Sequence, residues 1–347
     1  MKKMKAVVYG LGNFYREFGE QINELYEVVA KTDRDINAME GMLSIGEALS
    51  LPYDIIIIMI KNIKACFDVI NNLMSNYSVP ADKMMLGVNL SAQNAWDRLD
   101  INANGNIVFN KNNISIITKN LDEFNNIKGI FCADCYNYFL NDTVGEVVID
   151  IGMNIGGASL YFMNRHNVAK VYGFEPFTDT FAEAEENFKL NGIDDRERIE
   201  CFPYGISDVN ECRKVTYNKN MTCGQSTNVE INAKARKNYY EWELICNNDD
   251  KAIEVEVRDI KEVLQKIYEA HRNENIVLKL DCEGEEYRIM NRLDEEHLFD
   301  RIKVIMLEYH YEGEKKLIEI LKKNQYSYWV FKHEGLEGWG EIYALKK

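Results

Sequence analysis

Two stretches of the sequence share one outline, and together they restrict the fold more than any other feature. AVVYGLGNFYREFG at residues 6–19 and VVIDIGMNIGGASL at residues 147–160 each join an apolar run to a glycine-rich turn and then to a helical pattern. Glycine lets the chain turn tightly after a strand, so that backbone N–H groups at the start of the next helix can approach a ligand. Each stretch is therefore typical of a nucleotide-binding strand–turn–helix.

Apolar strands alternate with amphipathic helices around both turns, which predicts βαβ units and parallel sheets in an α/β fold. A chain of 347 residues suits two domains. We expect a small Rossmann-like α/β domain over 1–92, an Asn-rich connector over 93–143 with a helix at 129–142, and a second α/β domain over 144–347. In the second domain, five parallel strands are followed by two segments, 326–333 and 340–347, that predict a terminal antiparallel hairpin.

Composition and charge argue against several classes of protein. A net charge of −15 disfavours a protein that neutralises phosphates, so no nucleic-acid partner is expected. The longest apolar run, at residues 55–60, is far too short to span a membrane, and the N-terminus lacks the apolar core of a signal peptide. We therefore expect a cytoplasmic protein with reduced cysteines, in which Cys132 and Cys135 are two buried thiols on a helix rather than zinc ligands.

The second glycine turn carries an acidic residue, Asp150, at its head. A carboxylate there disfavours a pyrophosphate and favours a cationic amine, such as the ammonium of S-adenosylmethionine (SAM). The next predicted strand ends in Gly-Phe-Glu-Pro, and Glu175 is placed to accept the hydroxyls of a ribose. Both SAM and NAD contain a ribose, so Glu175 alone does not distinguish them. Together the two features favour a nucleoside site.

Over residues 145–345 the sequence resembles the FkbM family of SAM-dependent methyltransferases. The resemblance includes VVIDIGMNIGGASL, YGFEPF, GISD, GQSTN, VEVRDIKEVL, LKLDCEGEEYRIM and VIMLEYH, in that order. It implies a class I methyltransferase fold, SAM as methyl donor, and a hydroxyl acceptor on a sugar, a glycan or a glycosylated small molecule. The residues expected to bind the cofactor are Asp150, Gly152, Asn154, Gly156, Gly157, Glu175, Pro176 and Phe177.

Four side chains at or just beyond the ends of the last two parallel strands are candidates for the catalytic base: Asp281, Glu283, Glu308 and His310. His310 is the most natural titrating group near neutral pH. The same set could hold Mg²⁺ or Ca²⁺, but metal-independent transfer is favoured, and no metal ligand is assigned. Glu285 and Glu286 are expected to lie at a solvated helix start, and the remaining histidines are expected to be structural.

The sequence leaves the roles of two segments open. The insertion over 208–250 is expected to form a lid or an acceptor wall, where an aromatic group could stack on a sugar: Tyr239, Tyr240 and Trp242. In the first glycine turn, Tyr15 replaces the third glycine of the dinucleotide pattern, which disfavours NAD although Asp33 ends the next strand. The first domain is expected to be a scaffold, through which the chain can form a homo-oligomer, or else to bind a ligand such as a nucleotide-sugar. For the whole chain, the alternatives to a methyltransferase are an NAD-dependent or nucleotide-sugar-modifying enzyme that uses the first domain and a noncatalytic SAM-binding assembly protein.

Overall fold

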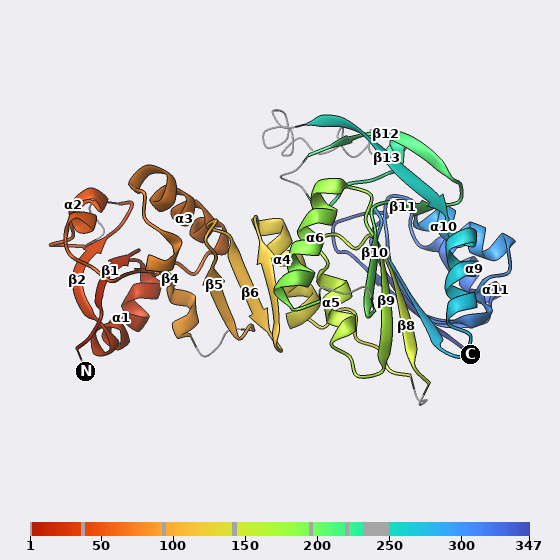
Figure 1. Ribbon diagram of the computed structural model, residues 1–347, viewed down its shortest axis with the longest axis horizontal. Coiled ribbons are helices and arrows are strands. Elements are labelled where there is room, and N and C mark those ends of the chain that lie inside the picture. The colour runs from red at the N-terminus through yellow and green to blue at the C-terminus, as the bar shows by residue number, and fades with distance from the viewer. Residues whose placement is uncertain are drawn as a thin grey trace. The chain divides into compact units, whose positions relative to one another are not determined.

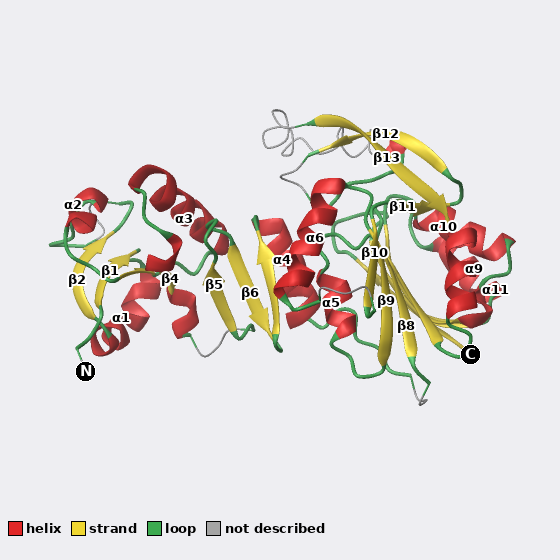
Figure 2. Ribbon diagram, in the orientation of Figure 1, coloured by secondary structure: helices red, strands yellow, loops and turns green. Residues whose placement is uncertain are grey.

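The computed structural model describes residues 2–35, 39–91, 95–140, 144–193, 197–218, 222–231 and 250–347 (Figures 1 and 2). The chain forms two compact units, Met1–Ala133 and Asp134–Lys347. The segment predicted as a connector is thus divided between them, and its larger part belongs to the first unit.

The first unit begins with a four-stranded parallel sheet of order β2-β1-β3-β4. Its central strands are apolar on both faces because helices cover both sides, and Ile56, Ile57 and Ile58 are fully buried. This arrangement confirms the predicted Rossmann-like domain. The elements are β1 (Lys5–Tyr9), α1 (Asn13–Leu25), β2 (Glu27–Thr32), α2 (Ile45–Ser50), β3 (Ile55–Ile58), α3 (Ile63–Tyr77) and β4 (Met84–Leu86).

The rest of the first unit is more ordered than the predicted connector. A three-stranded antiparallel sheet, β5-β6-β7, is formed by Arg98–Ile101, Ile107–Lys111 and Ile114–Thr118. It is followed by helix α4 (Leu121–Cys132), which Asn120 caps by accepting from the backbone N–H of Glu123. Phe109 and Phe124 pack edge to face between this sheet and α4.

The predicted helix over 129–142 is wrong beyond Cys132. Asp134 has a left-handed backbone, with φ of 57°, which ends the helical path. Cys132 is therefore the last residue of α4, and Cys135 lies outside any helix. Both thiols are partly buried rather than fully buried, and burial raises the pKa of Cys132 and raises that of Cys135 to about 12.

The second unit is built on a seven-stranded sheet of order β10-β9-β8-β14-β15-β17-β16. The first five strands are parallel, and β17 and β16 add an antiparallel hairpin, as predicted. The strands are β8 (Glu146–Ile151), β9 (Val168–Phe174), β10 (Ile199–Phe202), β14 (Asn275–Leu280), β15 (Ile302–Tyr309), β16 (Tyr326–Lys332) and β17 (Gly340–Lys346).

Helices cover both faces of this sheet (Figure 1). The largest core cluster joins the sheet to the face covered by α9, α10 and α11, through residues such as Leu264, Ile289 and Leu321. The helices are α5 (Gly157–Met163), α6 (Thr178–Leu190), α9 (Ile260–Ala270), α10 (Glu286–Glu295) and α11 (Lys315–Lys323). No helix in the described part of the chain combines the length and the apolar character needed to cross a membrane.

A second, smaller sheet lies beyond one end of the large one in Figure 2. Its order is β11-β13-β12, formed by Gly205–Ser207, Lys251–Asp259 and Glu211–Tyr217. Part of the insertion predicted to be irregular is therefore a strand, β12, which pairs antiparallel with β13. The aromatic residues proposed for sugar stacking, Tyr239, Tyr240 and Trp242, lie outside the described residues.

Candidate active site

The carboxyl ends of four parallel strands bring the predicted site residues of the second unit to one edge of the sheet. The glycine turn follows β8, Glu175 follows β9, Asp281 follows β14, and His310 follows β15. Ile151, the last residue of β8, pairs with Leu280, the last residue of β14, so the turns after these two strands start at the same level. Leu307 of β15 also pairs with Leu280, and β15 continues to Tyr309. Ligands in open α/β sheets bind at this edge.

Two glycines of the turn leave no room for a larger residue, each because of a different neighbour. Gly152 has φ of 77° and packs so closely on Asp281 that a Cβ would overlap the carbonyl oxygen of that residue. Gly156 has φ of 84°, and a Cβ there would lie 2.7 Å from the ring of Phe188 on α6. Gly157 is buried and starts helix α5. The turn therefore lies against the segment that follows β14.

The carboxylate of Asp150 is engaged inside the protein and is not free to contact a ligand. It is fully buried, accepts a 2.7 Å hydrogen bond from the hydroxyl of Ser159, and lies 3.1 Å from the ammonium of Lys279. Lys279 also donates a 2.7 Å hydrogen bond to the carbonyl of Gly152. The negative charge expected to attract a cationic amine is thus paired inside the protein, and the pair holds the glycine turn in place.

Glu175 is buried at the end of β9 and links two parts of the site. Its carboxylate accepts from the backbone N–H groups of Asn154 at 3.0 Å and Phe177 at 3.1 Å. Burial raises the pKa of Glu175 to about 7, and the two N–H groups oppose this shift. Pro176 is half-buried, while the ring of Phe177 stacks on Tyr217 at 5.2 Å in the core of the smaller sheet.

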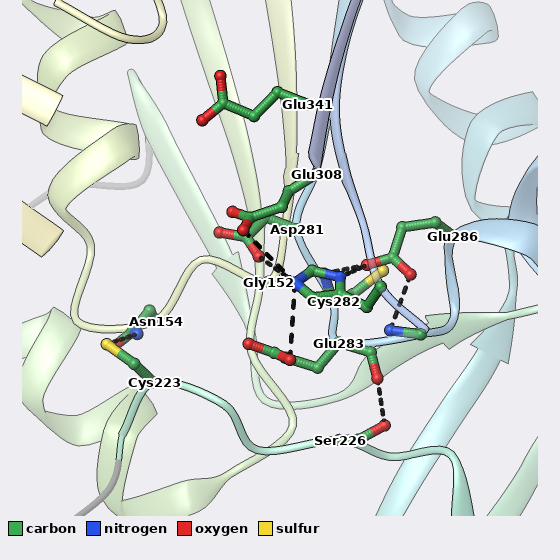
Figure 3. Close-up of polar contacts among 12 residues, drawn as sticks. Gly152, Asn154, Cys223, Ser226, Asp281, Cys282, Glu283, Glu286, Glu308 and Glu341 are labelled. Atoms are coloured by element: carbon green, nitrogen blue, oxygen red, sulfur yellow. Dashed lines mark hydrogen bonds and ion pairs between the residues drawn. The ribbon is translucent and has the colours of Figure 1, made fainter. Parts of the chain in front are cut away.

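Asn154 is held from both sides of the turn. Its φ is 51°, and its side-chain oxygen accepts from the backbone N–H of Ile155 at 2.6 Å. Its amide nitrogen lies 3.3 Å from the Sγ atom of Cys223 and 3.4 Å from the carbonyl oxygen of Thr222. The segment around Cys223 therefore lies next to the predicted cofactor turn (Figure 3).

Three of the four predicted catalytic side chains, Asp281, Glu283 and Glu308 (Figure 3), lie around the imidazole of the fourth, His310, which is 1% exposed. The Nε2 atom of His310 lies 3.6 Å from Glu283, 3.7 Å from Glu308 and 4.0 Å from Asp281. Ligand atoms of Asp281, Glu283 and His310 all lie within 4.8 Å of one another. We call these four residues the carboxylate–histidine cluster.

Glu286 supports this cluster from the opposite side of the ring. Its Oε1 atom lies 2.9 Å from the Nδ1 atom of His310, and the carboxylate also accepts from the backbone N–H groups of Cys282 at 3.0 Å and Gly284 at 2.7 Å. The backbone carbonyl of Glu283 accepts from the hydroxyl of Ser226 at 2.6 Å. One buried carboxylate thus fixes both the histidine and the turn that carries Glu283.

The prediction that Glu285 and Glu286 lie at a solvated helix start is wrong, because both side chains are fully buried. Glu285 accepts a 2.7 Å charged hydrogen bond from Arg213 on β12 and a hydrogen bond from Ser207 on β11. A buried carboxylate is retained when such partners replace its water. Glu285 therefore fastens the smaller sheet to α10.

Burial and mutual repulsion change the acidity of the carboxylate–histidine cluster. Burial raises the pKa of Glu283 to about 7 and that of Glu308 to about 8, and the charge of Asp281 adds to both shifts. Burial alone would lower the pKa of His310, but Glu283 and Glu286 raise it well above its ordinary value. A positive charge close to these carboxylates, such as that of a protonated His310, lowers the pKa of Glu283 and Glu308 and so stabilises their ionised forms.

The sequence did not predict that Lys279 and Glu286 belong to the site, or that His333 lies beside it. Lys279 had a visible signal, since it is a lone charged residue in the otherwise apolar strand NIVLKL. His333, expected to be structural, is one-third exposed on the terminal hairpin, 3.8 Å from Glu308 and 3.6 Å from Glu341. His271 fits its structural role, with its Nε2 atom 2.9 Å from the hydroxyl of Tyr172.

The first glycine turn, in the other unit, has its acidic residue engaged by the chain itself. Asp33 accepts from the backbone N–H of Leu11 at 2.6 Å and from that of Asp35 at 3.0 Å. Tyr15 is buried in the core between α1 and the sheet, and a Cβ on Gly19 would lie 3.3 Å from its ring. Asp33 and Tyr15 are thus both engaged by contacts within the first unit.

Comparison with known proteins identifies the second unit. The sequence model of the methyltransferase FkbM domain matches residues 150–328. Methyltransferase sdnD of Sordaria araneosa is 27% identical over 184 residues, which are 49% of this chain and 68% of that protein. Methyltransferase 1 of Beauveria bassiana is 26% identical over 182 residues, which are 51% of this chain and 70% of that protein.

Solved structures give more distant matches. The crystal structure of methyltransferase FkbM from Methylobacillus flagellatus aligns over 99% of this chain and 90% of that one, with 12% identity and a TM-score of 0.38. Precorrin-6y C5,15-methyltransferase from Geobacter metallireducens aligns over 60% of this chain and 84% of that one, with 13% identity and a TM-score of 0.30.

Proposed function

The chain belongs to the FkbM methyltransferase family, and from this premise we propose that it transfers a methyl group from SAM to a hydroxyl oxygen of a sugar, a glycan or a glycosylated small molecule. One contact carries the proposal. The backbone of Gly152, in the predicted cofactor turn, packs directly on the carbonyl of Asp281, in the carboxylate–histidine cluster. A cofactor held by the turn and an acceptor held by the cluster would thus be neighbours.

The residues of the glycine turn fit a nucleoside cofactor. Gly152 and Gly156 have backbones that only glycine adopts without strain, and Glu175 offers carboxylate oxygens that can accept ribose hydroxyls. When bound, SAM supplies an activated methyl group on a sulfonium. Asp150 contributes through Lys279, which it holds against the carbonyl of Gly152.

The carboxylate–histidine cluster supplies the acceptor side of the reaction. An acceptor hydroxyl must lose its proton as its oxygen forms the new bond to carbon, while the carbon–sulfur bond breaks and leaves its electron pair on sulfur. The carboxylates around His310 raise its pKa, which favours the protonated imidazole and makes His310 a poor base. The side chain of Glu308 is 28% exposed, and its carboxylate, once ionised above its raised pKa of about 8, is the best placed group to take the proton.

Calorimetry with S-adenosylhomocysteine, SAM and NADH tests the cofactor. We expect the two adenosyl ligands to bind and NADH not to bind, because Tyr15 replaces the third glycine of the dinucleotide pattern in the first glycine turn. Tight NADH binding without binding of S-adenosylhomocysteine would overturn the proposal and favour an oxidoreductase.

Product mass spectrometry tests the acceptor. The chain is incubated with methyl-labelled SAM and host glycan or small-molecule extracts, and labelled products are fragmented to locate the methyl group. We expect the label on a hydroxyl oxygen of a sugar-containing product. A label found on nitrogen, with none on oxygen, would contradict the proposed acceptor class and leave the methyl donor in place.

A further inference from the structure

The Nε2 atom of His310 points into a group of carboxylates without bonding to any of them. Among the described residues it has no hydrogen-bond partner, and its three nearest carboxylate oxygens lie 3.6 Å, 3.7 Å and 4.0 Å away. His310 is nevertheless 1% exposed. Three carboxylates thus surround the Nε2 side of the imidazole at distances beyond a direct hydrogen bond (Figure 3).

One carboxylate oxygen of the cluster is a buried polar atom without a partner, which is costly. The Oε2 atom of Glu283 is buried and has no hydrogen-bond partner, although it is the atom closest to Nε2 of His310. Ser226 holds the backbone carbonyl of the same residue, so the turn cannot easily move to relieve this atom. This oxygen and Nε2 of His310 thus face each other at 3.6 Å, beyond direct hydrogen-bond distance.

The spacing suits an ion placed between these atoms. Around a six-coordinate ion with metal–ligand distances of about 2.1 Å, neighbouring ligand atoms lie about 3 Å apart and opposite ones about 4.2 Å apart. The three distances from Nε2, which run from 3.6 Å to 4.0 Å, fall between these limits. Small side-chain movements would bring all four atoms to an ion.

The far side of the imidazole is prepared for a metal ligand. The Nδ1 atom of His310 lies 2.9 Å from Glu286, whose carboxylate is itself fixed by two backbone N–H groups. A carboxylate on the second nitrogen sets the tautomer and makes the metal-facing nitrogen more basic. Charge also favours a cation: Glu341 adds to the negative field at Glu308, while Lys279 lies 3.8 Å from Asp281 and is already paired with Asp150.

We propose that the carboxylate–histidine cluster binds a divalent cation of the manganese class through Nε2 of His310 and the carboxylates of Asp281, Glu283 and Glu308. Three oxygen ligands and one imidazole nitrogen suit Mn²⁺ better than Mg²⁺, which prefers oxygen alone, or Zn²⁺, which prefers a tetrahedral set with more nitrogen or sulfur. Glu286 is a positioning residue for His310. This site replaces the metal-independent cluster expected from the sequence.

The proposed cation specifies which acceptors the proposed methyltransferase takes, and this part of the inference rests on the proposed function. Four protein ligands leave two positions of a six-coordinate ion for the acceptor. An acceptor with two adjacent oxygens, such as a vicinal diol, would fill both. The ion makes the bound hydroxyl more acidic, and its proton passes to a carboxylate oxygen that does not contact the ion. The substrate class is therefore a hydroxyl with a neighbouring oxygen.

Titration of the full chain with Mn²⁺, followed by electron paramagnetic resonance, tests the site. We expect one site at which the signal of free Mn²⁺ is lost, and nitrogen modulation from the imidazole in the bound spectrum. Glu283→Gln and His310→Ala should weaken binding at least tenfold, and His310→Ala should also remove the nitrogen modulation. Glu337→Gln makes the same charge change on the exposed turn of the hairpin and should bind as the parent does.

Equal Mn²⁺ affinity in the parent, Glu283→Gln and Glu337→Gln, or a bound spectrum without nitrogen modulation, would overturn the proposal. If Glu283→Gln fails to fold, Glu308→Gln at the more exposed side of the cluster serves instead, with the same expected loss. The titration needs neither SAM nor acceptor. Failure to bind Mn²⁺ with S-adenosylhomocysteine binding intact would therefore overturn the metal site alone, whereas the reverse result would overturn only the proposed function.

Discussion

The ammonium of Lys279 lies 3.1 Å from the carboxylate of Asp150, and both side chains are buried, with 2% of Lys279 and 0% of Asp150 exposed. These residues are on adjacent parallel strands, β14 and β8, and are paired in register. Lys279 also donates to the carbonyl of Gly152. The pair thus connects the two strands that carry the cofactor turn and the carboxylate–histidine cluster.

Substituting one partner of this pair should destabilise the chain strongly. Lys279→Met leaves a buried carboxylate without compensation, which costs about 3–5 kcal/mol of unfolding free energy. Asp150→Asn leaves the ammonium in the same position, and the double variant should lose less than the sum of the single losses. Denaturant unfolding of all four chains measures this coupling. Additive losses would show that the two charges do not depend on each other.

The strand pattern made the sheet edge predictable, but not the pairing inside it. The apolar runs and glycine turns of the second unit gave five parallel strands, and parallel strands necessarily bring Asp281 and His310 to one edge. The partner of Asp150 depends on which strand lies beside β8. Because β14 follows β8 by more than a hundred residues, local pattern does not reveal that Lys279 pairs with Asp150.

The same limit explains the errors around Glu286 and the connector. A run of charged residues such as CEGEEYR ordinarily begins a solvated helix. Glu286 and Glu285 are buried instead, because His310 and Arg213, which are distant in the sequence, form hydrogen bonds with them. In the connector, strands β5, β6 and β7 are short and are joined by Asn-rich turns, so their pairing rests on contacts between strands rather than on a strong local pattern.

Affinity for S-adenosylhomocysteine should depend on pH through Glu175. Burial raises the pKa of Glu175 to about 7, so below pH 7 the ligand-free chain holds this group protonated. Ribose hydroxyls donate best to the ionised form, and binding must then release a proton. Affinity should therefore rise with pH from 5.5 to about 7.5, by up to about tenfold per unit below the pKa, and then level off.

Calorimetry across this pH range measures the effect, and Glu175→Gln is its matched control. Glutamine keeps the size of the side chain but does not titrate, so its weaker affinity should be flat over the same range. A parent chain with no pH dependence, or a Glu175→Gln variant with the parent's affinity, would remove Glu175 from the ribose role.

The carboxylates of the carboxylate–histidine cluster should affect turnover more than cofactor binding. Asp281→Asn and Glu308→Gln change groups that face His310 rather than the glycine turn. We expect methyl incorporation from labelled SAM into extracts to fall about 100-fold or more, with the dissociation constant for S-adenosylhomocysteine within about threefold of the parent's. Glu337→Gln should retain parental activity. Full activity in both cluster variants would place the acceptor elsewhere.

Gly152 should be intolerant of alanine for a reason that goes beyond its backbone angle. Gly152 and Gly192 have similar φ values, 77° and 70°, so alanine at either position pays the same left-handed strain of about 1–2 kcal/mol. At Gly192 a Cβ meets no atom within 4 Å, whereas at Gly152 it overlaps the carbonyl oxygen of Asp281. Gly152→Ala must therefore also push apart the turns after β8 and β14.

The comparison of these two glycines isolates the contact on which the proposed function rests. Gly192→Ala should lower the unfolding free energy by about 1–2 kcal/mol and leave binding of S-adenosylhomocysteine unchanged. Gly152→Ala should lose more stability than this and should also lose cofactor affinity, because Gly152 and Asp281 separate together. Denaturant unfolding and calorimetry on both variants measure the difference. If Gly152→Ala matched Gly192→Ala in both measurements, close packing of the cofactor turn on Asp281 would not be required for the site.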